Sequence, residues 1–227
     1  MYIFCSAGPA SHRRGQLSSN VRPRNPPMSQ LRAGSISQVT RDSGSWAFID
    51  IGFASNKASC GFALDDGPPT LLTFANLKTR VVQLAQESQD PLNLVIEAPL
   101  SVAFSVNGNP VGRSVEKRGG AARYWYFGLG CGVLVAATYL LRALNDAPRC
   151  RDVRLFEGLV SFKPKGVRSS HTADVVALRA VAWRLPEGRG RVIAPEALRV
   201  QPSDHIHSAF TVAGFDLGIP PVFAIEA

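Results

Sequence analysis

The chain has 227 residues, 45% hydrophobic and 19% charged, which predicts one sizeable core and a single domain with an irregular tail. Its formal net charge is +8, but five of these eight charges fall within residues 1–45, so total charge alone does not indicate a nucleic-acid partner. The four cysteines lie far apart without a C-x-x-C spacing. This argues against a zinc site or a disulfide framework and favours reduced thiols in the cytoplasm.

Residues 1–44 are rich in Ser, Pro, Arg and Gly and show no apolar periodicity. We therefore expect a disordered basic tail, followed by one domain over residues 45–227. The tail lacks the apolar segment of a signal peptide. A basic arm that contacts phosphate and a translation start at Met28 are two alternative interpretations of it.

The first half of the domain predicts four strands and a helix. Strands are expected over residues 46–52, 58–64, 70–75 and 92–98, and Pro99 ends the last of them. A helix is expected over residues 77–89. Its apolar side chains recur at helical spacing, at Leu77, Val81, Leu84 and Ala85.

Residues 101–123 predict a loop that carries spaced basic side chains, among them Arg113, Arg118 and Arg123. Because this loop directly follows a strand that ends in an acid, its cations are placed to hold an anionic substrate. A solvated cationic loop is an equally good interpretation of the same residues taken alone.

Residues 124–141 are the most apolar part of the chain and have about the minimum length of a membrane span. Three glycines, many small residues and strand patterns on both sides favour a helix buried against a sheet instead. No membrane association is therefore expected. A fifth strand is predicted over residues 153–157, and helices over residues 172–185 and 203–213.

Single acids recur inside the apolar runs. Asp50, Glu97 and Glu157 each lie at or near the end of a predicted core strand. A lone charge in such a run is normally excluded unless it is paired or binds a metal. If these strands are neighbours in one sheet, the three carboxylates come together as a site for a hard divalent cation.

Two predicted helices offer a further acid, because Asp174 and Asp204 each fall in a first turn. Asp174 shares a helix face with Leu178, so it points toward the core. Asp204 shares a face with His207. The helix dipole favours an acid at such a position in any protein, which is the alternative interpretation for both.

The order of elements and the acid-bearing motifs resemble the RNase H-like superfamily. Within it the chain is most similar to a bacterial family of uncharacterised predicted RNase H-like nucleases. The resemblance covers residues 46–218 and depends on five stretches: WAFIDIG with Asp50, VIEAPLS with Glu97, the arginine-bearing loop, RLFEGLVSF with Glu157, and SDHIHSAFTVAG with Asp204. It implies an α/β fold with a mixed five-stranded sheet in the order 3-2-1-4-5 and helices on both faces.

The resemblance also implies a metal-dependent nuclease that uses Mg²⁺ or Mn²⁺. Asp50 is expected to bridge two cations, Glu97 and Asp204 each to complete one, and Glu157 to bind or to support a ligand. His207 occupies the second acidic position of the closing motif and is expected beside the ligands. The motif favours Asp204 as the last acid, whereas proximity to the fifth strand favours Asp174. Phosphate contacts are expected from Arg113, Arg118, Arg123, Lys163, Lys165 and Arg168.

Two other classes remain open. One is a catalytically inactive RNase H-like module that binds nucleic acid or a protein partner. The other is an ATPase related to actin and the sugar kinases. Such ATPases require two such domains and glycine-rich phosphate loops, and this chain has room for only one domain. The sequence distinguishes neither DNA from RNA nor one oligomeric state from another.

Overall fold

The computed structural model describes residues 30–87, 90–118, 121–122, 129–148, 151–160 and 170–225. A mixed central sheet dominates these residues. Its eight strands are β1 (Leu31–Ala33), β2 (Ser45–Asp50), β3 (Cys60–Leu64), β4 (Thr70–Leu72), β5 (Leu92–Glu97), β10 (Val153–Leu159), β11 (Gly190–Ile193) and β13 (Val222–Ile225). The predicted α/β class is therefore confirmed, with more strands than the five expected.

The strand order in this sheet is β11-β13-β10-β5-β2-β3-β4, and β1 pairs with β10 in addition. β2, β5 and β10 run parallel to one another, and β3 and β4 follow antiparallel on the β2 side. Residues 222–225, close to the C-terminal end of the sequence, form β13 between β10 and β11. β13, β10, β5 and β2 are therefore four neighbouring parallel strands in the middle of the sheet, with their carboxyl ends at the same edge.

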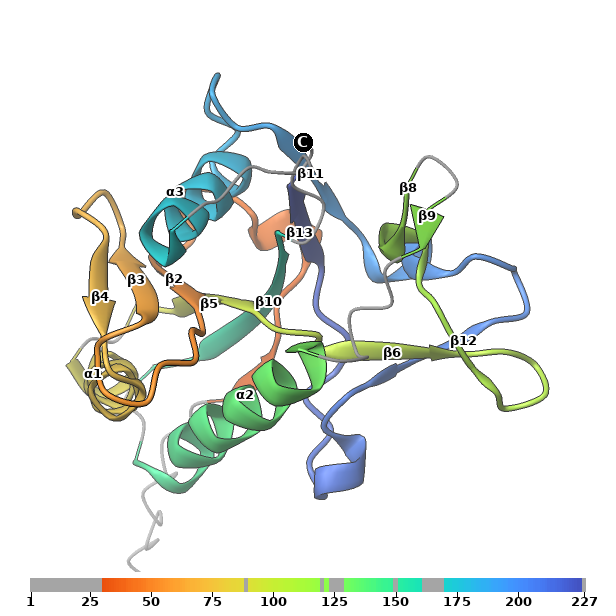
Figure 1. Cartoon of the computed structure of the whole chain (residues 1–227), viewed down its shortest axis with the longest axis horizontal. Helices are drawn as coiled ribbons and strands as arrows, with labels where there is room; N and C mark the ends of the chain where they lie inside the picture. The colour runs from red at the N-terminus through yellow and green to blue at the C-terminus, as the bar shows by residue number, and fades with distance from the viewer. Residues whose placement is uncertain are drawn as a thin grey trace, which may run out of the picture.

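Helices cover both faces of the sheet (Figure 1). α1 (Phe74–Glu87) and α2 (Leu129–Asp146) pack on one face, and α3 (His171–Ala182) packs on the other. The four apolar positions predicted for α1 are its buried residues in the structure: Leu77, Val81, Leu84 and Ala85. In the described part of the chain, no helix combines the length and the apolar character needed to cross a bilayer.

The predicted loop after β5 forms strands instead. β6 (Ser101–Phe104) pairs with β7 (Pro110–Val111) and with β12 (His205–Ser208), and this second sheet projects away from the central one (Figure 1). β8 (Lys117–Arg118) and β9 (Ala121–Ala122) form a short hairpin. Short 3-10 helices are η1 (Ile36–Gln38), η2 (Ser114–Glu116), η3 (Pro195–Leu198) and η4 (Thr211–Ala213).

Residues 30–44 correct the predicted boundary of the tail, because they belong to the fold. β1 runs parallel to β10, and Val39 is buried. The chain leaves β1 through Gly34, which lies directly over the ring of Phe156. Three residues are too short a strand for sequence periodicity to reveal, so only the partner strand identifies it. Residues 1–29 lie outside the described part.

We expect Gly34→Ala to lower the free energy of unfolding by about 1–3 kcal/mol, the usual cost of overpacking a core. A Cβ there would lie 2.2 Å from Cζ of Phe156, whose ring is fully buried and packs against Trp46 and Phe223, so the ring could give way only by disturbing these aromatic contacts. Urea denaturation measures the change. Gly132→Ala, at an exposed helical position with only ordinary contacts, is the control and should not destabilise the chain.

Candidate metal centre

Asp50 and Glu97 lie side by side on adjacent parallel strands. They are register partners at the ends of β2 and β5, and register partners in a parallel pair point to the same face of the sheet. That face is the α3 face, because Phe48 and Val95, two residues earlier on each strand, belong to the core beneath α3. Asp50 is almost fully buried and Glu97 partly exposed.

Asp174 reaches the same place from above the sheet. α3 begins after Ser170, whose hydroxyl accepts a hydrogen bond from the Ala173 amide, and Asp174 lies in its first turn. One carboxylate oxygen from each of Asp50, Glu97 and Asp174 lies within 4.8 Å of the other two. In the described residues, this is the one cluster of three or more side chains able to bind a metal.

The donor set of this cluster fits a hard divalent cation. Mg²⁺ takes oxygen ligands at about 2.0–2.1 Å, so two ligands of one ion lie at most about 4.2 Å apart. Small side-chain movements therefore bring the three oxygens within reach of a single cation. Carboxylates alone, without thiolate or imidazole, favour Mg²⁺ or Mn²⁺ over zinc.

His171 is a site residue that the sequence analysis missed. Its Nδ1 atom lies 2.7 Å from Oδ2 of Asp50, and its side chain is 41% exposed. Gly61 permits this approach, because a Cβ there would lie 2.2 Å from the His171 carbonyl oxygen. The available signal was the spacing: His171 precedes Asp174 by three residues, so both side chains lie on one face of α3.

Burial governs the protonation of Asp50. Desolvation raises the pKa of Asp50 above its ordinary value, and the hydrogen bond to Glu97 and the contact with His171 lower it only in part. The charge of Asp174 raises it further. The metal-free cluster therefore tends to retain a proton that a bound cation would displace.

This raised pKa predicts two opposite responses to pH. The neutral form of Asp50 is the one that the fold favours, so its contribution to stability is full below the ordinary aspartate pKa and is lost as pH rises through the raised value. Metal affinity should increase over the same pH window because the proton competes with the cation. Melting curves with EDTA and with Mn²⁺, recorded from pH 4 to pH 8, should diverge; parallel curves would contradict the assignment.

Glu157 lies on the other face of the sheet. Its register partner on β5 is Ile96, whereas Glu97 is paired with Gly158. Alternation along the strand therefore turns Glu157 away from Asp50 and toward the face covered by α1 and α2. The carboxylate of Glu157 is fully buried there and accepts a hydrogen bond from the Leu100 amide.

Arg113, which the sequence offered as a substrate contact, is the partner of Glu157. Its guanidinium is fully buried, lies 2.8 Å from Glu157 and 3.0 Å from Glu116, and donates to the Ser101 hydroxyl. Desolvation lowers the pKa of Arg113, but the two carboxylates outweigh it and raise the pKa above its ordinary value. A permanently charged, enclosed side chain of this kind is structural, so the substrate prediction for Arg113 is corrected.

Asp204 and His207 also lie apart from the cluster. The predicted helix over residues 203–213 is wrong, because β12 and η4 occupy these positions. The buried carboxylate of Asp204 accepts the Val200 and Gln201 amides, which closes the turn before β12. His207 is exposed on β12 beside Phe104. Ser and Asp are favoured in turns as well as at the start of a helix, so the local pattern did not separate the two.

The side chains of the other predicted phosphate contacts lie outside the described part of the chain. Arg118 lies in β8, and its side chain is outside the described part, as are Arg123, Lys163, Lys165 and Arg168.

A comparison of the chain with protein-family models, with curated proteins and with solved structures finds no match.

Proposed function

We propose that this chain is a divalent-metal-dependent nuclease with an RNase H-like domain, in which Asp50, Glu97 and Asp174 hold Mg²⁺ or Mn²⁺. The observation that carries the proposal is the convergence of these three carboxylates within 4.8 Å from three separate elements. The succession β4-β3-β2-β5-β10 supports the RNase H-like arrangement, because it runs in the order 3-2-1-4-5. β1, β11 and β13 are additions beyond the fifth strand.

The three acids of the cluster have different roles in this proposal. Asp50, Glu97 and Asp174 would hold the cation, which would provide an activated water and neutralise charge on the phosphodiester. Asp50, the most central acid, is oriented by His171, which fixes its Oδ2 atom. Asp174 would add a second ligand from the first turn of α3, and Glu97 would add a third from the partly exposed side of the cluster.

Phe53 supports nucleic acid as the substrate class. It follows Asp50 by three residues in the chain, and its side chain is 63% exposed although it is large and apolar; its ring lies against Gly132 of α2. Aromatic rings on the surface of nucleic-acid-binding proteins stack unpaired bases. A small phosphodiester without a base would gain nothing from such a ring.

One observation favours the second function, an inactive RNase H-like module that binds nucleic acid or protein. Asp50 already has two partners without any cation, His171 and Glu97. A cluster satisfied in this way is stable as a purely structural feature. The two functions differ in turnover, so an activity measurement separates them.

The decisive experiment is cleavage of end-labelled single-stranded DNA, duplex DNA, RNA and RNA–DNA hybrid in Mg²⁺, Mn²⁺ or EDTA. Glu97→Gln should reduce metal-dependent cleavage by more than about 100-fold, because loss of a ligand should exceed the 10- to 100-fold cost of losing a ligand's hydrogen-bond partner. Glu87→Gln, an exposed change on α1, should leave the rate unchanged. Absence of cleavage by the unmodified chain on every substrate would favour the inactive module.

A further inference from the structure

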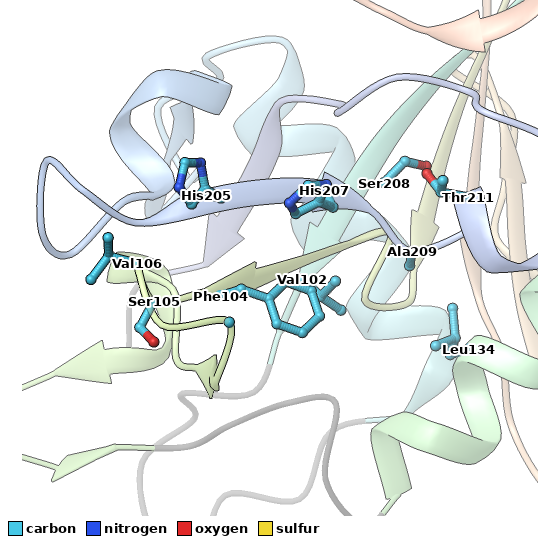
Figure 2. Close-up of a pocket in the computed structure, with 11 residues that line it drawn as sticks. Val102, Phe104, Ser105, Val106, Leu134, His205, His207, Ser208, Ala209 and Thr211 are labelled. Atoms are coloured by element: carbon cyan, nitrogen blue, oxygen red, sulfur yellow. The ribbon is translucent and has the colours of Figure 1, made fainter.

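A cavity of about 550 Å³ lies beside the second sheet, between β6, the β6–β7 turn, β12 and α2 (Figure 2). None of the residues that line it belongs to the carboxylate cluster. It is therefore a separate site, and its interpretation does not depend on the proposed nuclease activity.

Strand alternation builds the floor of this cavity. Val102 and Phe104 point to one face of β6, and their register partners on antiparallel β12 are His207 and His205. Residues opposite each other across an antiparallel pair share a face, so two apolar side chains and two imidazoles form one patch. Figure 2 shows the two histidines along β12, with Leu134 of α2 beside Ala209 at the far end.

The size of the cavity decides the class of occupant. Cavities of about 300–1,000 Å³ with mainly apolar walls are typical of small-molecule sites. A protein partner requires a surface of about 800 Å² on each side, which a pocket of this volume does not offer. Val102, Phe104, Val106 and Leu134 provide apolar walls, and the Phe104 ring suits a flat ligand.

The polar groups of the lining decide the charge of the occupant. Among the described residues that line it, the ionisable side chains are His205 and His207, and none is acidic. The two rings lie 6.4 Å apart, and each imidazole offers at least one N–H donor in any protonation state. Donors without a competing carboxylate complement an anionic group.

We propose that this cavity binds a small organic anion with a flat apolar body. The body lies between Phe104 and Leu134, and the anionic group lies at the edge formed by His205 and His207. Because the histidines are exposed, the charged end of the ligand remains close to water while the body is buried.

Two fluorescent probes with a similar body test this proposal on the full chain: 8-anilinonaphthalene-1-sulfonate, and the neutral N-phenyl-1-naphthylamine. We expect saturable one-site binding of the sulfonate. Leu134→Trp, which fills the cavity, should weaken both probes by at least about tenfold. Val135→Trp changes the neighbouring exposed position on α2 and should leave binding intact.

The double change His205→Ala with His207→Ala separates the anion contact from the apolar one. It should weaken the sulfonate by about tenfold, the loss of a charge-assisted hydrogen bond, and leave the neutral probe unchanged. Ala209→Leu provides a second filling variant, and melting curves identify any variant that does not fold. Probe binding that is not saturable, or that survives both filling variants, would overturn the proposal, as would equal weakening of the two probes by the histidine changes.

Discussion

Asp174→Asn should abolish the stabilisation of this chain by Mn²⁺, whereas Asp204→Asn should leave it intact. The two aspartates are matched, because each is 6% exposed and each was a candidate for the same role. They differ in place: Asp174 joins Asp50 and Glu97, whereas Asp204 closes a turn. Only the first change removes a carboxylate of the proposed metal site.

The expected effect is large. A cation present at 100 times its dissociation constant stabilises the folded state by about 2.7 kcal/mol. For a domain of this size that corresponds to a rise in Tm of roughly 5–10 °C. The unmodified chain and Asp204→Asn should show this rise, and Asp174→Asn should not.

The Tm of each variant without metal provides an independent check, because there Asp204→Asn is expected to be the more damaging change. The charge of Asp174 helps to raise the pKa of Asp50, so removing it relieves repulsion, and Asp174→Asn should not lower the metal-free Tm. Asp204→Asn weakens two hydrogen bonds from backbone amides to a carboxylate and should lower it. A metal shift that persists in Asp174→Asn and disappears in Asp204→Asn would replace the assigned cluster with the one first expected from the motif.

Arg113→Met should be strongly destabilising, by about 3–5 kcal/mol, the usual cost of breaking a buried ion pair. The change leaves Glu116 and Glu157 buried side by side without their cation. Urea denaturation measures the loss. Arg142→Met, which removes the exposed pair with Asp146, is the control and should cost less than about 1 kcal/mol.

A triple variant separates the charge from the packing. Arg113→Met combined with Glu116→Gln and Glu157→Gln removes the uncompensated charges and should recover most of the lost stability. If Arg113 is purely structural, the triple variant should also retain nucleic-acid cleavage. A stable triple variant that no longer cleaves would restore Arg113 as a substrate contact.

Much of the central sheet could be predicted from local pattern. Apolar runs broken by Pro99 and by the turn-forming sequence DDGPP at residues 65–69 located β2 to β5, and helical spacing located the buried face of α1. Asp50 and Glu97 were also predictable, because a single acid in an apolar run is rare in any fold. β1 was missed because it lies in a stretch rich in Ser, Pro, Arg and Gly, and β12 because the residues before it favour the start of a helix.

The chain by itself determined which side chains alternate along each strand and which acids stand in its core, since both depend on neighbours a few residues apart. Only the tertiary structure decided which acids meet. The face of the sheet on which Glu157 lies depends on the register between β10 and β5, strands about 60 residues apart in the chain. A shift of one residue in this register would turn the Glu157 side chain to the opposite face. The choice between Asp174 and Asp204 needed the docking of α3 over Gly61, which long-range packing sets and no local period encodes.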